Sequence, residues 1–352
     1  MKKILFFICT LDDGGAQRVV SMLSSKMAER GFDVEVLKYY KSKNIYPISN
    51  EVKITTVEEE TNTTNKLRNM LWMRKYFRKN ADVIVSFLAT YNMLAICANI
   101  GNSIPIIVAD RNDPRFVPEN RILRSLRNFL YRYADGIVTQ TTDNKNYFSK
   151  KIQEKCEVIM NPFSMKDKIG IALNSMKENY IVSVGRLEKQ KNQLMLINAY
   201  SNGIDRDYKL IIYGEGPYRK VLEDRISELK LNDFVLLPGS AENILEKIKT
   251  ASLFVLTSNY EGMPNALAEA MCIGLPVIST KVSGASDLID ENENGILIDL
   301  NDEDGLIDNI KKLINDNKLR EKLSKNASKI SSKIDIDSIA EQWLEFINRV
   351  QK

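Results

Sequence analysis

Short apolar runs alternate with longer amphipathic stretches along the first half of the chain. Strands are predicted at 2–9, 32–38, 82–87, 105–109, 135–140 and 157–160, and the intervening stretches have helical periodicity. This alternation is typical of a parallel α/β sheet. Asn161 and Pro162 break the pattern, and the polar stretch that follows predicts an interdomain linker.

A second alternating series begins at Tyr180. It predicts strands at 180–185, 209–214, 234–237, 251–258 and 276–280, followed by helices at 302–315, 317–332 and 337–350. Ligands of parallel sheets bind at the carboxyl ends of the strands, so two such sheets predict a site in a shared cleft. We expect Rossmann-like domains at 1–163 and 180–336, a linker at 164–179 and a separate terminal helix at 337–352.

Composition places the chain among ordinary globular proteins, with 352 residues, 44% of them hydrophobic and 27% charged. The four cysteines have no paired spacing and indicate reduced thiols in a cytoplasmic protein. The apolar start runs into Asp12 without a cleavage site and predicts a first strand instead of a signal peptide. No apolar run approaches the roughly 20 residues that cross a bilayer, so any membrane contact is expected to be peripheral.

Two features of charge narrow the chemistry. The chain has no histidine, which removes the commonest general base and the commonest zinc ligand. Residues 1–165 hold 25 basic and 17 acidic side chains, whereas residues 166–352 hold 25 and 29. The basic first half predicts an anionic partner there, either a lipid phosphate or a membrane surface, and we expect no nucleic acid.

The most informative segment follows the apolar run at 251–258. Pro264 suits the first position of a helix, which leaves the backbone N–H groups of Asn265, Ala266 and Leu267 at its positive end as an anion site. Gly274 is expected to close this helix in a left-handed conformation. The segment therefore predicts strand, phosphate-binding loop, helix and strand.

Glu261 and Glu269 flank this predicted anion site. Carboxylates repel phosphate oxygens, so both are better matched to hydroxyl donors on either side of a diphosphate, one on a sugar and one on a ribose. The alternative is an exposed loop glutamate and a solvated helix glutamate, which is the commoner situation for an arbitrary pair. Arg186 and Lys191, after another predicted strand, would neutralise the diphosphate, although two surface cations explain them equally well.

The segment EGMPNALAEAMCIGLPVIST at 261–280 resembles the signature of the large retaining glycosyltransferase family numbered four, which has the GT-B fold. Further segments match in the expected order: DDGGAQR at 12–18, VGRLEKQKN at 184–192 and LIIYGEGP at 210–217. The resemblance implies two Rossmann-like domains facing across a cleft, with the terminal helix packed back on the first. Each glycine turn alone would indicate only a tight turn.

The resemblance also implies roles for individual residues. Glu261, Arg186 and Lys191 are the expected catalytic residues. Nucleotide-sugar contacts are expected at Gly15, Gly185, Arg186, Lys191, Gly214, Gly262, Met263, Pro264, Asn265, Ala266, Leu267 and Glu269. Contacts to the acceptor or the donor sugar are expected at Gly14, Arg111 and Asn112.

Arg111 and Asn112 stand where many relatives have a histidine that faces the donor sugar. The Arg-Asn-Asp-Pro pattern is similar to that of members acting on polyprenyl-diphosphate-linked sugars, which indicates a lipid-linked glycan acceptor. Four arginines, at 121, 124, 127 and 132, interleave with apolar residues on a predicted helix. They would cradle a lipid diphosphate or lie on anionic headgroups, or else form a solvated face whose arginine stems cover the core.

Together with these patterns, the resemblance implies a cytoplasmic, retaining hexosyl- or N-acetylhexosaminyltransferase, peripheral on the inner face of the cell membrane. We expect it to use a UDP-sugar as substrate for surface polysaccharide synthesis and to need no cofactor or metal. Aspartate pairs at 205/207, 302/304 and 335/337 do not follow buried strands and are not expected to bind metal. The alternatives are a glycosidase, a nucleotide-sugar epimerase of the same fold, and a non-catalytic subunit that binds the nucleotide-sugar.

Overall fold

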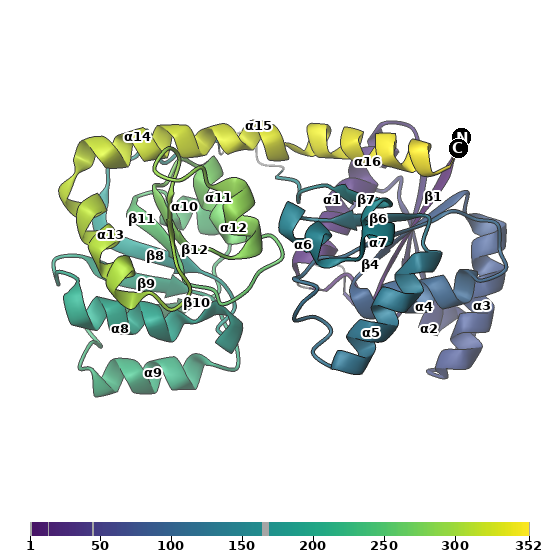
Figure 1. The fold of residues 1–352 in the computed structure, drawn as a ribbon, viewed down its shortest axis with the longest axis horizontal. Helices are drawn as coiled ribbons and strands as arrows, with labels where there is room; N and C mark the ends of the chain where they lie inside the picture. Colours follow the sequence, from purple (N-terminus) through teal and green to yellow (C-terminus); the bar gives the residue numbers. More distant parts are fainter. Residues whose placement is uncertain (1, 13, 44–45, 164–168, 352) are drawn as a thin grey trace. The chain divides into compact units, whose positions relative to one another are not determined.

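The computed structural model describes residues 2–351 except 13, 44–45 and 164–168, and it divides the chain into two compact units (Figure 1). The first unit combines residues 1–164 with 334–352, and the second comprises residues 165–333. The first five residues of the expected linker lie outside the described residues. Farther along it, the N–H groups of Gly170 and Ala172 donate to the carbonyls of Cys272 and Ile273, so this part is attached to the second unit.

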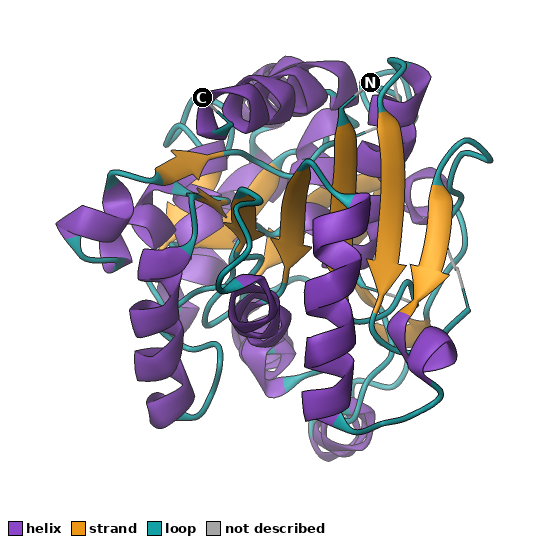
Figure 2. Cartoon of the chain, turned by 90° about the vertical axis from the view of Figure 1, so that its right-hand side faces the viewer, coloured by secondary structure: helices purple, strands orange, loops and turns teal. Residues whose placement is uncertain are grey.

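The first unit is built on a seven-stranded sheet in the order β3-β2-β1-β4-β5-β6-β7. Its strands are β1 (Lys3–Ile8), β2 (Asp33–Lys38), β3 (Lys53–Thr56), β4 (Val83–Phe87), β5 (Ile106–Ala109), β6 (Gly136–Thr139) and β7 (Cys156–Val158). All pairings are parallel, and neighbouring arrows point the same way in Figure 2. The predicted parallel sheet is confirmed, whereas β3 was missed because it is short and half polar.

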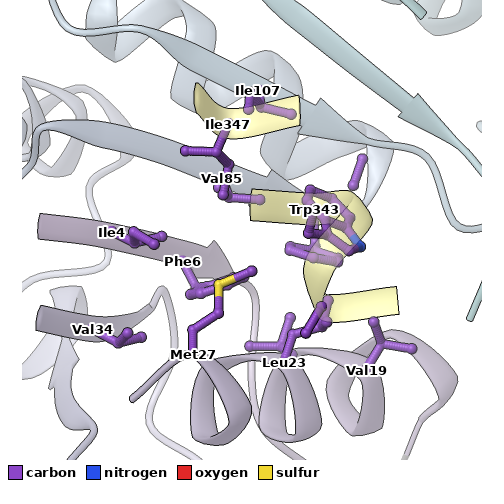
Figure 3. Packing of buried hydrophobic residues seen from close by; sticks show 14 of the residues in the cluster. Ile4, Phe6, Val19, Leu23, Met27, Val34, Val85, Ile107, Trp343 and Ile347 are labelled. Atoms are coloured by element: carbon purple, nitrogen blue, oxygen red, sulfur yellow. The ribbon is translucent and has the colours of Figure 1, made fainter. Parts of the chain in front are cut away.

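Helices cover both faces of this sheet. They are α1 (Gly15–Glu29), α2 (Val57–Thr61), α3 (Lys66–Asn80), α4 (Ala89–Asn99), α5 (Arg121–Leu130), the 3₁₀ turn η1 (Tyr131–Tyr133), α6 (Thr142–Tyr147), α7 (Lys150–Gln153) and α16 (Ile336–Val350). α1 and α16 bury Leu23, Met27, Trp343 and Ile347 against one face (Figure 3). α3, α4 and α5 pack on the opposite face, where α4 contacts both of its neighbours.

The second unit contains a six-stranded parallel sheet in the order β10-β9-β8-β11-β12-β13. Its strands are β8 (Glu178–Val184), β9 (Lys209–Tyr213), β10 (Val235–Gly239), β11 (Ala251–Leu256), β12 (Val277–Thr280) and β13 (Ile296–Ile298). Its helices are η3 (Lys189–Lys191), α8 (Gln193–Gly203), α9 (Arg219–Glu228), α10 (Ile244–Ile248), α11 (Asn265–Cys272), α12 (Ser283–Leu288), α13 (Glu303–Asn315), α14 (Asn317–Ala327), η4 (Ser328–Ile330) and α15 (Ser331–Ile334). The helix predicted at 317–332 is therefore interrupted after Ala327.

The positions of the strands determine where the site lies. In both sheets the candidate site residues follow the carboxyl ends of strands, as expected for parallel α/β units.

Among the helices in the described parts of the chain, none is both long enough and apolar enough to cross a membrane.

Candidate active site

Backbone packing at the ends of β8, β9 and β10 explains the glycine after β9. Gly214 has φ +144°, and a Cβ atom there would lie 2.0 Å from the carbonyl oxygen of Gly185. The Gly214 N–H donates to the Gly239 carbonyl at 2.9 Å, and the Gly185 N–H donates to the Tyr213 carbonyl at 3.0 Å. This close approach requires glycine at 214 without any ligand. A role for Gly185 and Gly214 in nucleotide binding stays a prediction.

The loop after β8 is fastened to the loop after β11. The Thr257 hydroxyl donates to the carbonyls of Lys191 and Asn192, both at 3.1 Å. The Asn259 N–H donates to the Gln190 carbonyl at 2.8 Å. These bonds join two segments far apart in the sequence, and they fix the backbone of Lys191 relative to that of Glu261.

Lys191 and Glu261 form an ion pair at this junction. Lys191 Nζ lies 2.5 Å from Glu261 Oε1, and the same oxygen accepts a hydrogen bond from the Ser258 hydroxyl at 2.6 Å. The Glu261 side chain is 7% exposed and that of Lys191 is 21% exposed, so the carboxylate is the more deeply buried partner. The sequence pattern singled out both charges but not Ser258, although a hydroxyl two residues after a buried strand was a usable signal.

Lys191 and Glu261 retain hydrogen-bonding capacity that a ligand could use. A lysine ammonium has three donors, and a carboxylate oxygen accepts at two lone pairs. Glu261 Oε1 already receives two bonds, whereas Oε2 receives a long one, 3.4 Å, from Gln190 Nε2. Lys191 thus presents positive charge, and Glu261 Oε2 presents an acceptor, next to each other.

Arg186 is not brought into this pair. Its guanidinium is 74% exposed and lies 3.1 Å from the Glu188 carboxylate. Exposed ion pairs are weak, so an anionic ligand can compete for this side chain at little cost. The structure places Arg186 at the end of β8 but leaves its expected contact with a diphosphate as a prediction.

The start of α11 differs from the prediction by one residue. Pro264 has φ −77° and ψ 90°, so it lies outside the helix as its N-cap, and Asn265 is the first helical residue. The prediction that Pro264 occupies the first helical position is wrong, because its ψ is extended. No described side chain caps this end, and the first turn has no acidic residue. The N–H groups of a first helical turn lack partners within the helix, so the expected anion site retains its physical basis.

The loop before α11 is supported by β12 and α12. The Thr280 hydroxyl donates to the Ser258 carbonyl at 2.7 Å. At Gly284, a Cβ atom would lie 2.5 Å from the Gly262 carbonyl oxygen and 2.6 Å from Pro264 Cδ. Gly284 therefore lets α12 pack directly under the loop at 262–264. Sequence reasoning missed this residue, although a glycine soon after a strand end indicates close backbone approach.

Glu269 lies half-buried on α11, beyond the predicted phosphate-binding turn. Burial, assisted by the Glu269 carboxylate, raises the pKa of the Cys272 thiol to about 12. The helix ends at Cys272, and Gly274, just after its C-cap, has φ +85°, the left-handed conformation that was predicted. The assignment of Glu269 to a ribose hydroxyl stays a prediction.

In the first unit, Gly14 and Gly15 form the start of α1. Gly14 is the extended N-cap residue, and its N–H donates to the Tyr46 hydroxyl at 3.4 Å. A Cβ atom at Gly14 would lie 2.3 Å from Gln17 Oε1. No described side chain caps α1, and no acidic residue stands in its first turn. The neighbouring Asp13 is outside the described residues.

Arg111 is enclosed at the end of β5. Its guanidinium carbon lies 4.9 Å from the Phe87 ring centre and 5.4 Å from that of Trp343 on α16. Nη1 donates to Asn161 Oδ1 at 3.0 Å, but Nε and Nη2 are buried without a hydrogen-bond partner among the described residues. Burial lowers the pKa of Arg111 to about 9, opposed by the charge of Asp110. Trp343 was not anticipated from the sequence.

The other residues of this turn are structural in the free protein. Asn112 Oδ1 accepts from the N–H of Asp113 at 2.9 Å. The buried Asp113 carboxylate binds the Arg115 guanidinium through two oxygens, at 2.9 and 2.8 Å. A sugar contact for Arg111 or Asn112 therefore remains a prediction. Within the described residues, no group of three or more Cys, Asp or Glu side chains is arranged to hold a metal ion.

Comparisons with known proteins connect the two units to one family. The model described as Glycosyltransferase Family 4 matches residues 13–166, and the one described as Glycosyl transferases group 1 matches residues 165–330. Two relatives from Campylobacter jejuni are each 30% identical. The first covers 100% of this chain and 99% of its own length, and the second covers 99% and 100%.

The first of these relatives is named as an α-1,4-N-acetyl-D-galactosaminyltransferase acting on GalNAc-alpha-(1->4)-GalNAc-alpha-(1->3)-diNAcBac-PP-undecaprenol. The second is an N-acetylgalactosamine-N,N'-diacetylbacillosaminyl-diphospho-undecaprenol 4-alpha-N-acetylgalactosaminyltransferase.

Solved structures share the fold. The crystal structure of Anabaena HepE in complex with UDP and glucose has a TM-score of 0.83 at 20% identity and covers 99% of this chain and 100% of its own. Sucrose-phosphate synthase from Thermosynechococcus elongatus has a TM-score of 0.86 at 17% identity, with 99% of both chains covered. The expected GT-B fold is confirmed.

Proposed function

Because the chain belongs to glycosyltransferase family 4, we propose that it transfers an N-acetylhexosamine from its UDP-sugar to a glycan carried on undecaprenyl diphosphate, with retention of anomeric configuration. Both Campylobacter jejuni relatives are named for transfers of this kind. With a lipid-linked acceptor we expect the reaction at a membrane surface, on the cytoplasmic side that the sequence predicts.

The ion pair between Lys191 and Glu261 is the observation that carries this proposal. It sets a cation beside a nearly buried carboxylate at the carboxyl edge of the sheet, with one carboxylate oxygen still able to accept a hydrogen bond. A sugar bound through a diphosphate complements both groups, because its phosphates bind cations and its hydroxyls donate hydrogen bonds to acceptors. Lys191 takes the diphosphate and Glu261 takes a hydroxyl of the donor sugar.

The other predicted site residues contact the nucleotide part of the donor. The first turn of α11, from Asn265 to Leu267, binds diphosphate oxygens through backbone N–H groups. Arg186 leaves Glu188 to join Lys191 there. Glu269 accepts from the ribose hydroxyls, since a carboxylate beside the phosphates themselves would repel them.

The lack of histidine constrains the transfer step. The acceptor hydroxyl attacks the anomeric carbon from the face that the diphosphate leaves. The bond between the anomeric carbon and the diphosphate oxygen breaks, a new bond to the acceptor oxygen forms, and a diphosphate oxygen takes the hydroxyl proton. Lys191 and Arg186 stabilise the negative charge that grows on the departing UDP.

Transfer is tested with purified protein, a panel of UDP-sugars and an undecaprenyl-diphosphate-linked oligosaccharide ending in N-acetylgalactosamine. We expect the acceptor mass to increase by one N-acetylhexosamine while one UDP is released, and we expect an α-linkage by NMR. Conversion of the free UDP-sugar to an isomer without acceptor would instead identify an epimerase. Nucleotide-sugar binding without turnover in any combination would identify a non-catalytic subunit.

Glu261→Gln separates the roles within the site. It keeps the size of the side chain but removes its charge, so we expect nucleotide affinity to stay within about threefold while transfer falls at least about a hundredfold. Calorimetric titration with UDP measures the first quantity and product formation the second. An equal loss of UDP affinity would show that Glu261 belongs to the nucleotide part of the site.

A further inference from the structure

Helix α5 and the η1 turn that continues it expose a row of apolar side chains, whereas Arg127 points inward. Ile122 is 77% exposed, and Leu126 and Phe129 on α5 and Tyr133 on η1 follow it at helical spacing with exposures between 44% and 57%. By contrast, Arg127 is fully buried. A helix at the surface of a globular protein normally has the opposite arrangement.

The inward arginines are held by the protein itself. Arg127 donates to the carbonyls of Val117 and Pro114, at 2.5 and 2.9 Å. Arg124 donates to the carbonyls of Pro118 and Glu119, both at 2.9 Å. These two of the four arginines noted in the sequence thus stabilise the loop before α5. Arg127, which is fully buried, is not available to cradle a lipid diphosphate.

The outward side is both apolar and basic. Arg121 and Arg132 are exposed, and the Arg132 guanidinium lies 5.9 Å from the Phe129 ring centre. α3 packs on the same face of the sheet (Figure 1). It adds six exposed basic residues and exposed Leu67 and Leu71. Neither α3 nor α5 contains an acidic residue.

We propose that the outer surface of α5, with basic support from α3, docks onto an anionic lipid bilayer. Exposed aliphatic and aromatic side chains between cationic ones are what a helix needs to lie in the interface of such a membrane. The inference rests on the proposed function for its purpose, because an undecaprenyl-linked acceptor stays in the bilayer while this surface brings the enzyme to it.

Charge favours a membrane over a second copy of the chain. A symmetric dimer places the same patch of both subunits in contact. In such a dimer, basic side chains would face basic side chains, namely Arg121, Arg132 and those of α3, which is electrostatically unfavourable. Anionic lipid headgroups complement the same charges.

Vesicle sedimentation tests the proposal without any sugar nucleotide. We expect the protein to bind vesicles of phosphatidylglycerol and phosphatidylcholine, and to bind phosphatidylcholine alone at least about tenfold more weakly. Ile122→Asp combined with Phe129→Asp should lower binding to the anionic vesicles at least about tenfold, since both side chains would enter the interface. Arg121→Glu with Arg132→Glu should weaken binding and reduce its salt dependence.

Val221→Asp on α9 is the matched control, because Val221 is also an exposed apolar residue on a helix, at 42%, but belongs to the second unit. Its vesicle binding should equal that of the unaltered protein. Equal loss in this control, unchanged binding of the double aspartate variant, or no binding of the unaltered protein would each overturn the proposal. A dimer in analytical ultracentrifugation that the double aspartate variant converts to a monomer would assign the surface to self-association.

Activity distinguishes failure of this inference from failure of the proposed function. The double aspartate variant should retain the transfer rate on a short-chain, water-soluble acceptor and lose at least about tenfold on acceptor embedded in vesicles. Absence of transfer with normal vesicle binding would contradict the proposed function alone. Normal transfer on vesicle-embedded acceptor by the double variant would contradict the docking surface alone.

Discussion

Removing Lys191 should destabilise the second unit more than neutralising Glu261 does. In Lys191→Met, the carboxylate of Glu261 remains only 7% exposed and loses its cation at 2.5 Å. Removal of one partner from a buried pair costs about 3 to 5 kcal/mol, because the remaining charge stays desolvated. Glu261→Gln leaves the lysine unpaired instead, and that side chain is 21% exposed, so we expect a cost of about 1 to 2 kcal/mol.

The double variant provides the decisive comparison. With Met at 191 and Gln at 261, neither charge remains, so its cost should fall about 2 kcal/mol below the sum of the two single variants. A matched cycle uses Lys220→Met and Asp224→Asn, an ion pair of 2.7 Å on α9 whose side chains are 79% and 63% exposed. That exposed pair should show no measurable coupling, because solvent screens it.

Calorimetry and circular dichroism measure these costs across both units. Fluorescence reports on the first unit, because both tryptophans, Trp72 and Trp343, belong to it. The variants at 191 and 261 should therefore shift the calorimetric transition of the second unit and leave the fluorescence transition in place. A coupling between Lys191 and Glu261 no larger than that of the α9 control would refute the argument that burial makes this pair strong.

Three further outcomes test other parts of the structure. Glu269→Ala should weaken UDP binding at least about tenfold in calorimetric titration, and unchanged affinity would remove Glu269 from the nucleotide site. Gly214→Ala should destabilise the protein by more than about 3 kcal/mol in thermal unfolding. Gly31 has φ +84° and no atom within 4 Å of an added Cβ, so Gly31→Ala should cost only about 1 kcal/mol. Equal costs would exclude the clash with the Gly185 carbonyl. Burial lowers the pKa of Lys177 to about 8, below its value in the unfolded chain, so the unfolded state binds more protons between about pH 8 and 10.5. The free energy of unfolding should therefore rise across that range relative to that of Lys177→Met. Parallel pH profiles of the two proteins would contradict this.

The sheets could be predicted because most of their strand residues are buried and apolar. Residues 83–87 and 251–256 are buried throughout, so the fold admits few polar side chains there. β3 escaped prediction because Ile54 is its only aliphatic residue, and β13 because its three residues form a short apolar run between polar segments. Their positions depend on pairing with neighbouring strands, which is non-local information.

The site was predictable in composition but not in its contacts. The sequence identified Lys191 and Glu261 separately, Lys191 for the diphosphate and Glu261 for the sugar. It did not show that the two side chains bind each other, since that contact requires Thr257 and Asn259 to fasten two loops separated by about 70 positions. Likewise, the pattern of α5 predicted an amphipathic helix without revealing which side faces inward. The carbonyls of the loop at 114–119 determine that, because they need the arginine donors.

The end of the chain completes the first unit. α16 contributes Ile339, Trp343 and Ile347 to the same core as β1, β4 and β5, so residues 1–164 alone would expose the apolar face that these side chains cover. Trp343 also lies against Phe87, at 5.9 Å between ring centres, and against Arg111. Arg111 is thus enclosed only after α16 has been made. Conformation at the end of β5 therefore depends on residues more than two hundred positions later, which is why no local pattern around Arg111 could have indicated its surroundings.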